Sequence, residues 1–255
     1  MRVRKRNGSY EEVSFDKVIN RLKNLCSMEP VLTKVDATEI AQKVCSRIYD
    51  GVYTYELDEL SAEQCTQKSV NHIEYSHLAS RIIISNNQKF TSPSFSETIY
   101  LLYHNKDKHN KPSPLISREV YQFVLDNKSK LNDCIDYSRD FNFDYFGFKT
   151  LEKAYLMKID GKIVERIQHL IMRVSIGIHS DNIKNVLETY DMISNKLFTH
   201  ATPTLFHSGT PRPQLLSCFL LGMHDSVHGM YKTIADCAQI SKWAGGIGVH
   251  IHDIR

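Results

Sequence analysis

The stretch "RPQLLSCFLLGM", residues 212–223, is a short apolar run whose large side chains lie between Pro213 and Gly222. A run of this length with such boundaries predicts a buried strand rather than a helix. Ser217 and Cys218 lie in its middle. The thiol of Cys218 is either a core filler, because free cysteine packs as a small hydrophobe, or a redox group. The surrounding sequence has to decide between the two.

The segments around this strand alternate between helix and strand patterns. A helix is expected near residues 227–243, and "AGGIGVHIHDIR" at 244–255 predicts a glycine turn followed by a second strand. A strand–helix–strand order predicts parallel pairing. Upstream we expect a hairpin at Asp160–Gly161, a loop over 199–214, and helices near 95–104, 116–127, 149–157, 167–178 and 181–197.

Residues 1–92 are predicted to form a compact unit of their own. A basic hairpin comes first, and Asp16 is expected to cap the first helix. Further helices are expected from about 36 to 49, from Thr54 onward, and from 75 to 89. "TSPS" at 91–94 is the expected boundary, so the chain is predicted to be mixed α/β: a helical bundle with a small β cap, then a second domain over 93–255.

Composition excludes several classes of protein. The 255 residues are 42% hydrophobic and 24% charged, as in ordinary globular proteins, and the formal net charge of +3 does not by itself imply nucleic acid. No apolar run reaches the roughly 18 residues that cross a membrane. "MRVRKRNGSY" has no apolar segment behind it, so a cytoplasmic location is expected, with no membrane and no nucleic-acid partner.

Cysteine and histidine spacing gives no metal site. None of the six cysteines forms a CxxC pair, which argues against a zinc ribbon or a thioredoxin motif. His250 and His252 would share one face of a strand, yet no third ligand is placed with them. We therefore expect no bound metal and no cofactor bound directly by this chain.

Three short patterns suggest ligand chemistry, and each has an ordinary alternative. Basic residues from Arg2 to Arg6 precede a helix start, a combination suited to phosphate, although a solvated basic end is equally compatible. "WAGGIG" at 243–248 allows close backbone approach to a ligand, or simply makes a helix-to-strand turn. Thr202 and Ser217 offer hydroxyls near the thiol, or serve as cap and turn residues.

Six longer segments are more specific than any of these patterns. Together they resemble the large, catalytic subunit of class I ribonucleotide reductases of the eukaryotic and viral type, over essentially all 255 residues. The segments are "KRNG…EEVSFDKV" near the start, "YDGVYTYELDELSAE" at 49–63, "SRDFNFDYFGFKTLEKAYL" at 138–156, "RVSIGIH" at 173–179, "THATPTLFHSGTPRPQLLSCFLL" at 199–221 and "ISKWAGGIGV" at 240–249.

The resemblance implies an ATP-cone over residues 1–92, a module that binds ATP or dATP and sets overall activity. Residues 93–255 are implied to be a helical lead-in and the first strands of a ten-stranded α/β barrel. The ATP or dATP residues carried over are Lys5, Arg6, Glu11, Glu12, Val13, Ser14, Phe15, Asp16, Lys17, Thr54, Asp58 and Lys89. From the residues alone, the cations suit phosphates and Asp58 suits ribose or base donors.

The resemblance also assigns residues to a substrate site and a specificity site. Cys218 matches one half of the redox pair that is oxidised as the ribose 2′-hydroxyl leaves. The substrate is implied to contact Ala201, Thr202, Ser217 and Gly246. A dNTP effector is implied to contact Asp225, Ser226, Val227, Lys242 and Arg255.

The implied reaction is radical reduction of ribonucleoside diphosphates to deoxyribonucleoside diphosphates for DNA synthesis. The implied partners are a metal-containing small subunit that supplies the radical, further copies of the chain, and thioredoxin or glutaredoxin as reductant. Because the sequence stops as the barrel begins, we expect only the N-terminal portion of such a subunit, inactive by itself. A non-catalytic nucleotide-binding regulator or assembly partner remains the alternative, although regulators with an ATP-cone and a zinc ribbon are disfavoured by the absence of CxxC.

Overall fold

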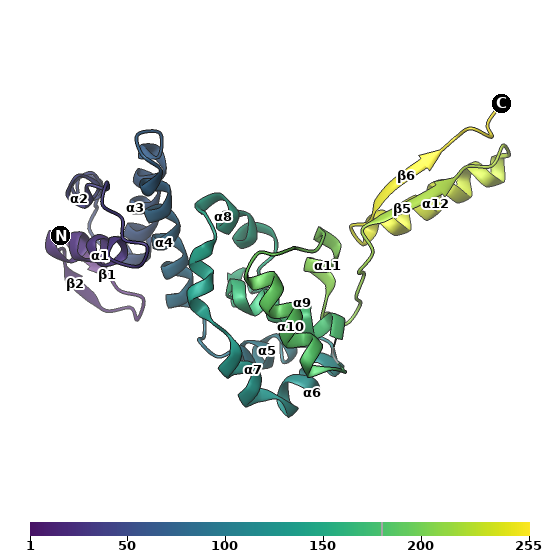
Figure 1. Cartoon of the computed structure of the whole chain (residues 1–255), viewed down its shortest axis with the longest axis horizontal. Coiled ribbons are helices and arrows are strands. Elements are labelled where there is room, and N and C mark those ends of the chain that lie inside the picture. Colours follow the sequence, from purple (N-terminus) through teal and green to yellow (C-terminus); the bar gives the residue numbers. More distant parts are fainter. Residues whose placement is uncertain (180) are drawn as a thin grey trace. The chain divides into compact units, whose positions relative to one another are not determined.

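The computed structural model describes residues 1–179 and 181–255 and confirms the mixed α/β class (Figure 1). The chain divides into two compact units. The first contains Met1–Pro93 and Asp136–Arg166, and the second contains Ser94–Ile135 and Ile167–Arg255. The first break in the chain lies within the "TSPS" segment. The division was expected to be two contiguous domains, but a later segment, Asp136–Arg166, groups with the first unit.

The first unit contains two small hairpins and a set of helices. Its elements are β1 (Arg2–Arg4), β2 (Tyr10–Glu12), α1 (Phe15–Cys26), α2 (Ala37–Cys45), α3 (Thr54–Lys68), α4 (Ile73–Phe90), the 3₁₀ helix η1 (Tyr137–Asn142), α8 (Tyr145–Ala154), β3 (Lys158–Ile159) and β4 (Lys162–Ile163).

The N-terminal hairpin forms as its turn sequence predicts. β1 and β2 are antiparallel, with Arg4 opposite Tyr10, and Gly8 takes the positive φ of +85° that the turn requires. The prediction that Asp16 caps α1 is wrong. Ser14 is the cap, because its extended backbone lets its Oγ accept from the Lys17 amide, and Asp16 lies inside the first turn.

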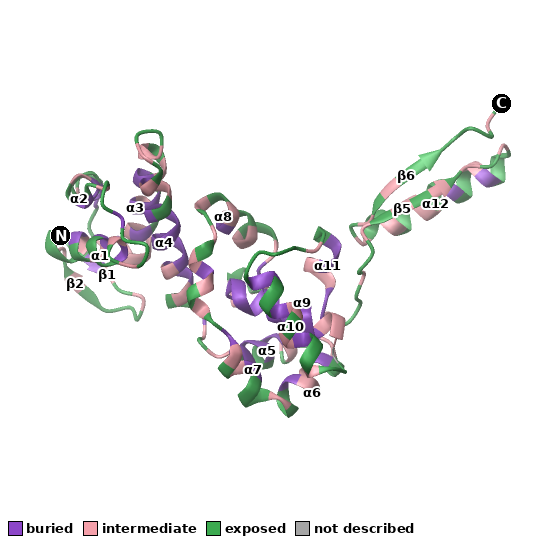
Figure 2. Ribbon diagram, in the orientation of Figure 1, coloured by how far each residue is buried: buried purple, intermediate pink, exposed green. Residues whose placement is uncertain are grey.

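The core of the first unit is made by the apolar faces of α1 to α4. Residues at helical spacing, such as Leu22 and Leu25 of α1 and Ile40 and Val44 of α2, are buried together against α4 (Figure 2). This is the outcome expected of amphipathic helices whose polar faces meet water. The same packing fixes the end of α4 next to the N-terminal hairpin, through the contact of Arg6 with Asn86.

Hydrogen bonds from α4 explain why Asp136–Arg166 belongs to the first unit. Gln88 Nε2 donates to Asp140 Oδ2 over 2.7 Å. Arg166 donates through Nε to Thr91 Oγ1 and through Nη2 to the Thr91 carbonyl, both over 3.0 Å. Both Arg166 and Asp140 are buried, so these bonds satisfy polar groups that would otherwise lose hydration.

The second unit is mainly helical and ends in a strand pair. Its elements are α5 (Phe95–Tyr103), α6 (Arg118–Asp126), α7 (Lys128–Cys134), α9 (Ile167–His179), α10 (Ile183–Ser194), α11 (Thr202–His207), β5 (Cys218–Gly222), α12 (Val227–Lys242) and β6 (Gly246–His250). Two elements of the chain, α7 and η1, were not predicted, and α11 lies where a loop was expected.

Helix α9 is the centre of the second unit, because its residues from Ile167 to Ile176 are all buried (Figure 2). The turn after α11 approaches it closely at Gly177. A Cβ atom on Gly177 would lie 2.2 Å from the Gly209 amide nitrogen and 2.3 Å from Ser208 Oγ. Only glycine fits such an approach, and Arg173 Nη1 donates to the Ser208 carbonyl beside it over 2.8 Å.

The strand pair forms in the predicted parallel arrangement, with Cys218 opposite Gly246. The prediction that β5 is buried is wrong for this chain. Helix α12 packs on β5 and β6, and Phe219 is half-buried, but Leu220 is 88% exposed. Successive strand residues point to opposite faces, and no element among residues 1–179 and 181–255 covers the face of Leu220.

No helix in the described part of the chain combines the length and the apolar character that crossing a bilayer demands.

Candidate functional site

A cavity of about 260 Å³ lies in the first unit, between the N-terminal hairpin, the start of α1, the start of α3 and the end of α4. Its lining combines charged and apolar side chains. These are Val3, Lys5, Arg6, Glu11, Glu12, Val13, Ser14, Lys17, Val18, Arg21, Leu22, Thr54, Leu57, Asp58, Ser61 and Lys89.

Ten of the twelve residues expected to contact ATP or dATP line this cavity, although they come from four separate stretches of sequence. The two that do not are Phe15 and Asp16, which lie in the first turn of α1. Sequence reasoning missed Arg21. Its spacing of four residues from Lys17, which puts both on one face of α1, was the available signal.

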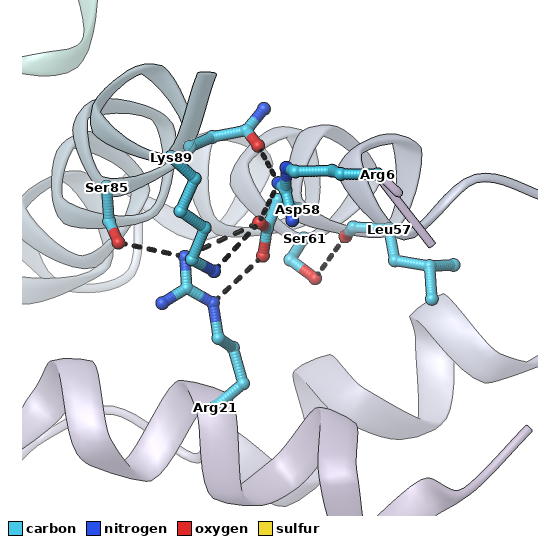
Figure 3. Close-up of polar contacts among 8 residues, drawn as sticks. Arg6, Arg21, Leu57, Asp58, Ser61, Ser85 and Lys89 are labelled. Carbon is cyan, nitrogen blue, oxygen red and sulfur yellow. Dashed lines mark hydrogen bonds and ion pairs between the residues drawn. The ribbon is translucent and has the colours of Figure 1, made fainter. Parts of the chain in front are cut away.

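Three cations converge on the carboxylate of Asp58, which is itself buried (Figure 3). Arg6 Nη2 lies 3.1 Å from Oδ2, and Arg21 Nε lies 3.1 Å from Oδ1. Lys89 Nζ lies 3.6 Å from Oδ2. The hairpin, α1 and α4 therefore each direct one positive charge at a single acid on α3.

A second ion cluster lies at the mouth of the hairpin. Glu11 forms ion pairs with both Lys5 and Lys17, so one carboxylate again bridges two cations. In total, five cationic and three carboxylate side chains line the cavity, which leaves a surplus of two positive charges. The N-terminus of α1, capped by Ser14, adds the positive end of a helix dipole.

The charge state of Lys89 responds to this environment. Burial lowers the pKa of its ammonium below the usual lysine value. Asp58 opposes that lowering, whereas Arg21 and Arg6 add to it. A cation whose pKa is lowered by burial and by like charges gains most from an incoming anion.

The apolar part of the lining gives the cavity a second character. Val3, Val13, Val18, Leu22 and Leu57 contribute aliphatic surface beside the charged groups. A ligand with a polyanionic end and a flat, largely apolar end would satisfy both parts. Nucleoside phosphates have this composition, because the phosphates suit the cations and the base suits the aliphatic wall.

Three of the five residues implied for substrate chemistry lie at the start of the strand pair in the second unit. The Gly246 amide donates to the Ser217 carbonyl over 2.6 Å, and Ser217 Oγ lies 3.6 Å from Cys218 Sγ. The structure thus brings Ser217, Cys218 and Gly246 together. Cys218 is exposed, contrary to the expected buried thiol, because it starts the strand whose outer face is uncovered.

Ala201 and Thr202 lie at the start of α11, as its cap and its first residue. That helix is linked to the strand segment by Thr204, whose Oγ1 donates to the Leu215 carbonyl over 3.0 Å. It is also linked by the His207 ring, whose centroid lies 6.2 Å from that of Trp243. The helix carrying the Thr202 hydroxyl is therefore tied to the segment that leads into Cys218.

The residues implied for a dNTP effector fall into two groups. Asp225, Ser226 and Val227 lie at the start of α12, and Arg255 Nε pairs with Asp225 Oδ2 over 2.8 Å. Lys242 is the last residue of the same helix. Fifteen residues of helix rise separate the two groups by roughly 22 Å, so one copy of α12 does not bring them together.

The other titratable groups of the strand segment form no metal site. The His250 and His252 rings stack, with their Nδ1 atoms 2.7 Å apart. Among residues 1–179 and 181–255, no group of three or more histidine, cysteine or acidic side chains is placed to hold an ion.

Comparison with known protein families accounts for most of the chain. The ATP cone domain matches residues 1–90. The ribonucleotide reductase all-alpha domain matches residues 141–213, and the ribonucleotide reductase barrel domain matches residues 216–255. The expected mixed α/β architecture is confirmed, although only β5 and β6 of the barrel domain are formed among the described residues.

Individual relatives are similar over the whole chain. The chain is 52% identical to the ribonucleoside-diphosphate reductase large subunit of Dictyostelium discoideum, covering 100% of this chain and 30% of that protein. It is 51% identical to the large subunit of Arabidopsis thaliana and 49% identical to the large chain of Schizosaccharomyces pombe, and covers 31% and 32% of them. The chain therefore spans about a third of the length of these relatives.

Three domains in the same order, and about half of all positions shared with each large subunit, place this chain in the family of ribonucleoside-diphosphate reductase large subunits, of which it is an N-terminal portion.

Proposed function

We propose that this chain is the nucleotide-regulated N-terminal part of a ribonucleoside-diphosphate reductase, and that its first unit binds ATP or dATP. The observation that carries this proposal is the cavity of about 260 Å³, lined by ten of the residues that the family resemblance names. Its surplus of positive charge suits the phosphates, and its aliphatic wall suits the base.

The lining of the cavity predicts which part of the nucleotide each side chain contacts. Lys5, Arg6 and Lys17 bind the phosphates, because their ammonium and guanidinium groups form charge-assisted bonds. Asp58 accepts from the ribose or base, and Thr54 offers a hydroxyl beside it. Phe15 and Asp16 take part only through the shape and dipole of the first turn of α1.

Isothermal titration calorimetry of the 255-residue chain tests the binding proposal. ATP and dATP should each give a saturable heat with one site per chain. Charge reversal at Arg6 should weaken binding by roughly tenfold or more, since bonds to charged groups contribute about 1.5–3 kcal/mol. Absence of saturable binding of either nucleotide by the folded chain would refute the proposal.

The proposed activity of the whole protein is radical reduction of ribonucleoside diphosphates. The 2′-hydroxyl leaves as water while two thiols are oxidised to a disulfide, and Cys218 is proposed as one of those two thiols. Ser217, Thr202, Ala201 and Gly246 are proposed to hold the substrate. A small subunit is proposed to supply the radical, and thioredoxin or glutaredoxin to reduce the disulfide.

Turnover assays separate this role of Cys218 from a structural one. The 255-residue chain alone should give no turnover. In a full-length subunit, Cys218→Ser should preserve folding and nucleotide binding and abolish multiple-turnover reduction. Because Cys218 is exposed here, its replacement by serine leaves no cavity in the core. A Cys218→Ser enzyme that still turns over with a dithiol reductant would exclude the assignment.

The proposed dNTP site needs two copies of the chain. Asp225, Ser226, Val227 and Arg255 are proposed to act with Lys242 of a second copy, because the two ends of α12 lie too far apart within one. Exposed apolar side chains on α12, Val227 and Tyr231 among them, are compatible with such self-association. Sedimentation with dTTP tests it, and a chain that stays monomeric with dTTP bound would refute it.

A further inference from the structure

Arg21 lines the cavity, yet it belongs to no sequence motif and is not among the residues to which the family resemblance gives a role. We propose that Arg21 is a phosphate-binding residue of this cavity, held in position by Asp58 and Ser85. The inference rests on the proposed nucleotide function and deepens it, because it names the group that recognises the phosphate chain from α1.

The hydrogen bonds of Arg21 leave part of its guanidinium available to a ligand (Figure 3). Nε lies 3.1 Å from Asp58 Oδ1, and Nη2 donates to Ser85 Oγ over 3.0 Å and to Asp58 Oδ2 over 3.4 Å. The contacts described for Arg21 thus use Nε and Nη2. Both Nη1 donors remain for an anion, in the forked geometry that matches phosphate oxygens.

Arg81, in the same unit, is bonded differently. Arg81 donates from Nη1 to the carbonyls of Leu25 and Met28 and from Nη2 to the carbonyl of Pro30. It is 5% exposed and joins three backbone carbonyls, as a structural arginine does. The Arg21 side chain is 25% exposed, faces the cavity and makes its described bonds to side chains only.

The local charges favour an anion at Arg21. Asp58 supplies one negative charge to Arg6, Arg21 and Lys89, so the three cations are not neutralised by it. Lys17 lies one turn earlier on the same face of α1. A phosphate group between Lys17 and Arg21 would meet two cations from one helix, and its charge would relieve their repulsion of the other cations.

A competing explanation is that Arg21 only orients Asp58. The two explanations differ in which part of the nucleotide loses affinity when Arg21 is changed. If Arg21 binds phosphate, its replacement weakens the binding of ATP and leaves the binding of adenosine unchanged. If Arg21 acts only by orienting Asp58, its replacement weakens the binding of ATP and of adenosine equally, because Asp58 is proposed to contact the ribose or base.

The experiment measures ATP by calorimetry and adenosine by NMR titration, at about 0.15 M salt so that distant charges are screened. The variants are Arg21→Gln, Arg21→Lys and the control Lys23→Gln, which removes a charge from the same helix outside this cavity. We expect Arg21→Gln to weaken ATP binding by roughly tenfold or more and adenosine binding by less than about twofold. Lys23→Gln should change neither by more than about twofold.

Arg21→Lys keeps the charge but lacks the fork, so we expect ATP binding to weaken severalfold. This variant decides the matter if Arg21→Gln does not fold. ATP affinity equal to wild type in the folded variants, or equal losses for ATP and adenosine, overturns the inference for Arg21. Wild-type protein that binds no ATP overturns the proposed function itself, so the two failures are distinguishable.

Discussion

Replacing Asp58 with asparagine should destabilise the first unit, because the side chain keeps its shape but loses its charge. Three cations lie within 3.6 Å of the carboxylate. One pair of unit charges at about 4 Å interacts by roughly 4 kcal/mol at an effective dielectric of 20. The cations are 24–38% exposed, which weakens each pair toward surface values below about 1 kcal/mol. We therefore expect a net loss of about 2 kcal/mol.

Thermal unfolding measures this loss and its reversal by ligand. For a unit of this size, about 2 kcal/mol corresponds to a decrease in Tm of roughly 5–10 °C. ATP should then raise the Tm of Asp58→Asn by more than it raises that of wild type. The asparagine amide oxygen can still accept from the ribose or base. In the variant the phosphates meet three cations that no carboxylate holds, so binding restores more of the lost Coulomb energy.

Glu63→Gln is the matched control, because Glu63 is an exposed acid on the same helix. Its Tm should stay within about 1 °C of wild type, as surface changes cost less than about 0.5 kcal/mol. The reasoning is refuted if Asp58→Asn unfolds at the wild-type temperature without nucleotide. It is also refuted if ATP stabilises the variant less than it stabilises the wild type.

Three further predictions concern single side chains. ATP affinity should fall as the pH rises through the lowered pKa of Lys89, and this fall should come at lower pH than in Lys89→Arg. The contribution of Lys89 to the free energy of unfolding should rise with pH, because the folded state binds fewer protons at Lys89 than the unfolded state does. Calorimetry and unfolding in a pH series check the two effects. Burial raises the pKa of Cys65 to about 12, so iodoacetamide at pH 8 should label the exposed Cys218 well before Cys65, as peptide mass mapping would show. Gly177→Ala should destabilise the second unit by about 1–3 kcal/mol in urea unfolding, because its Cβ would meet the Gly209 backbone at 2.2 Å; unchanged stability would contradict that close approach.

Local patterns predicted the elements whose own residues decide them. The apolar spacing of α1 and α2 and the turn residues of the hairpins are local signals, and those elements form where expected. The short helices α7 and η1 escaped prediction because their sequences carry no apolar period; Leu131 is the one buried residue of α7. The cap of α1 was misplaced by two residues, since Ser14 and Asp16 are both polar residues of a kind that caps helices.

Features set by distant contacts could not be predicted from local sequence. The joining of Asp136–Arg166 to α4 depends on Arg166 and Asp140 finding partners some fifty to eighty residues away. The burial expected for β5 depends on elements that cover both of its faces, and here α12 packs on the strand while Leu220 stays exposed. Arg21 belongs to no motif, and its role emerges only when α1, α3 and α4 are placed around one cavity.

The acids of the cavity explain how it can be stable and still receptive to an anion. Five cations within one small cavity would repel each other strongly if nothing neutralised them. Asp58 and Glu11 each bridge two or more of them, which reduces the repulsion without removing the positive surplus. Phosphate binding must therefore compete with carboxylates that already hold the same cations. The affinity of the site is a difference between two sets of ion pairs, so the charge of Asp58 should affect unfolding and binding in opposite directions.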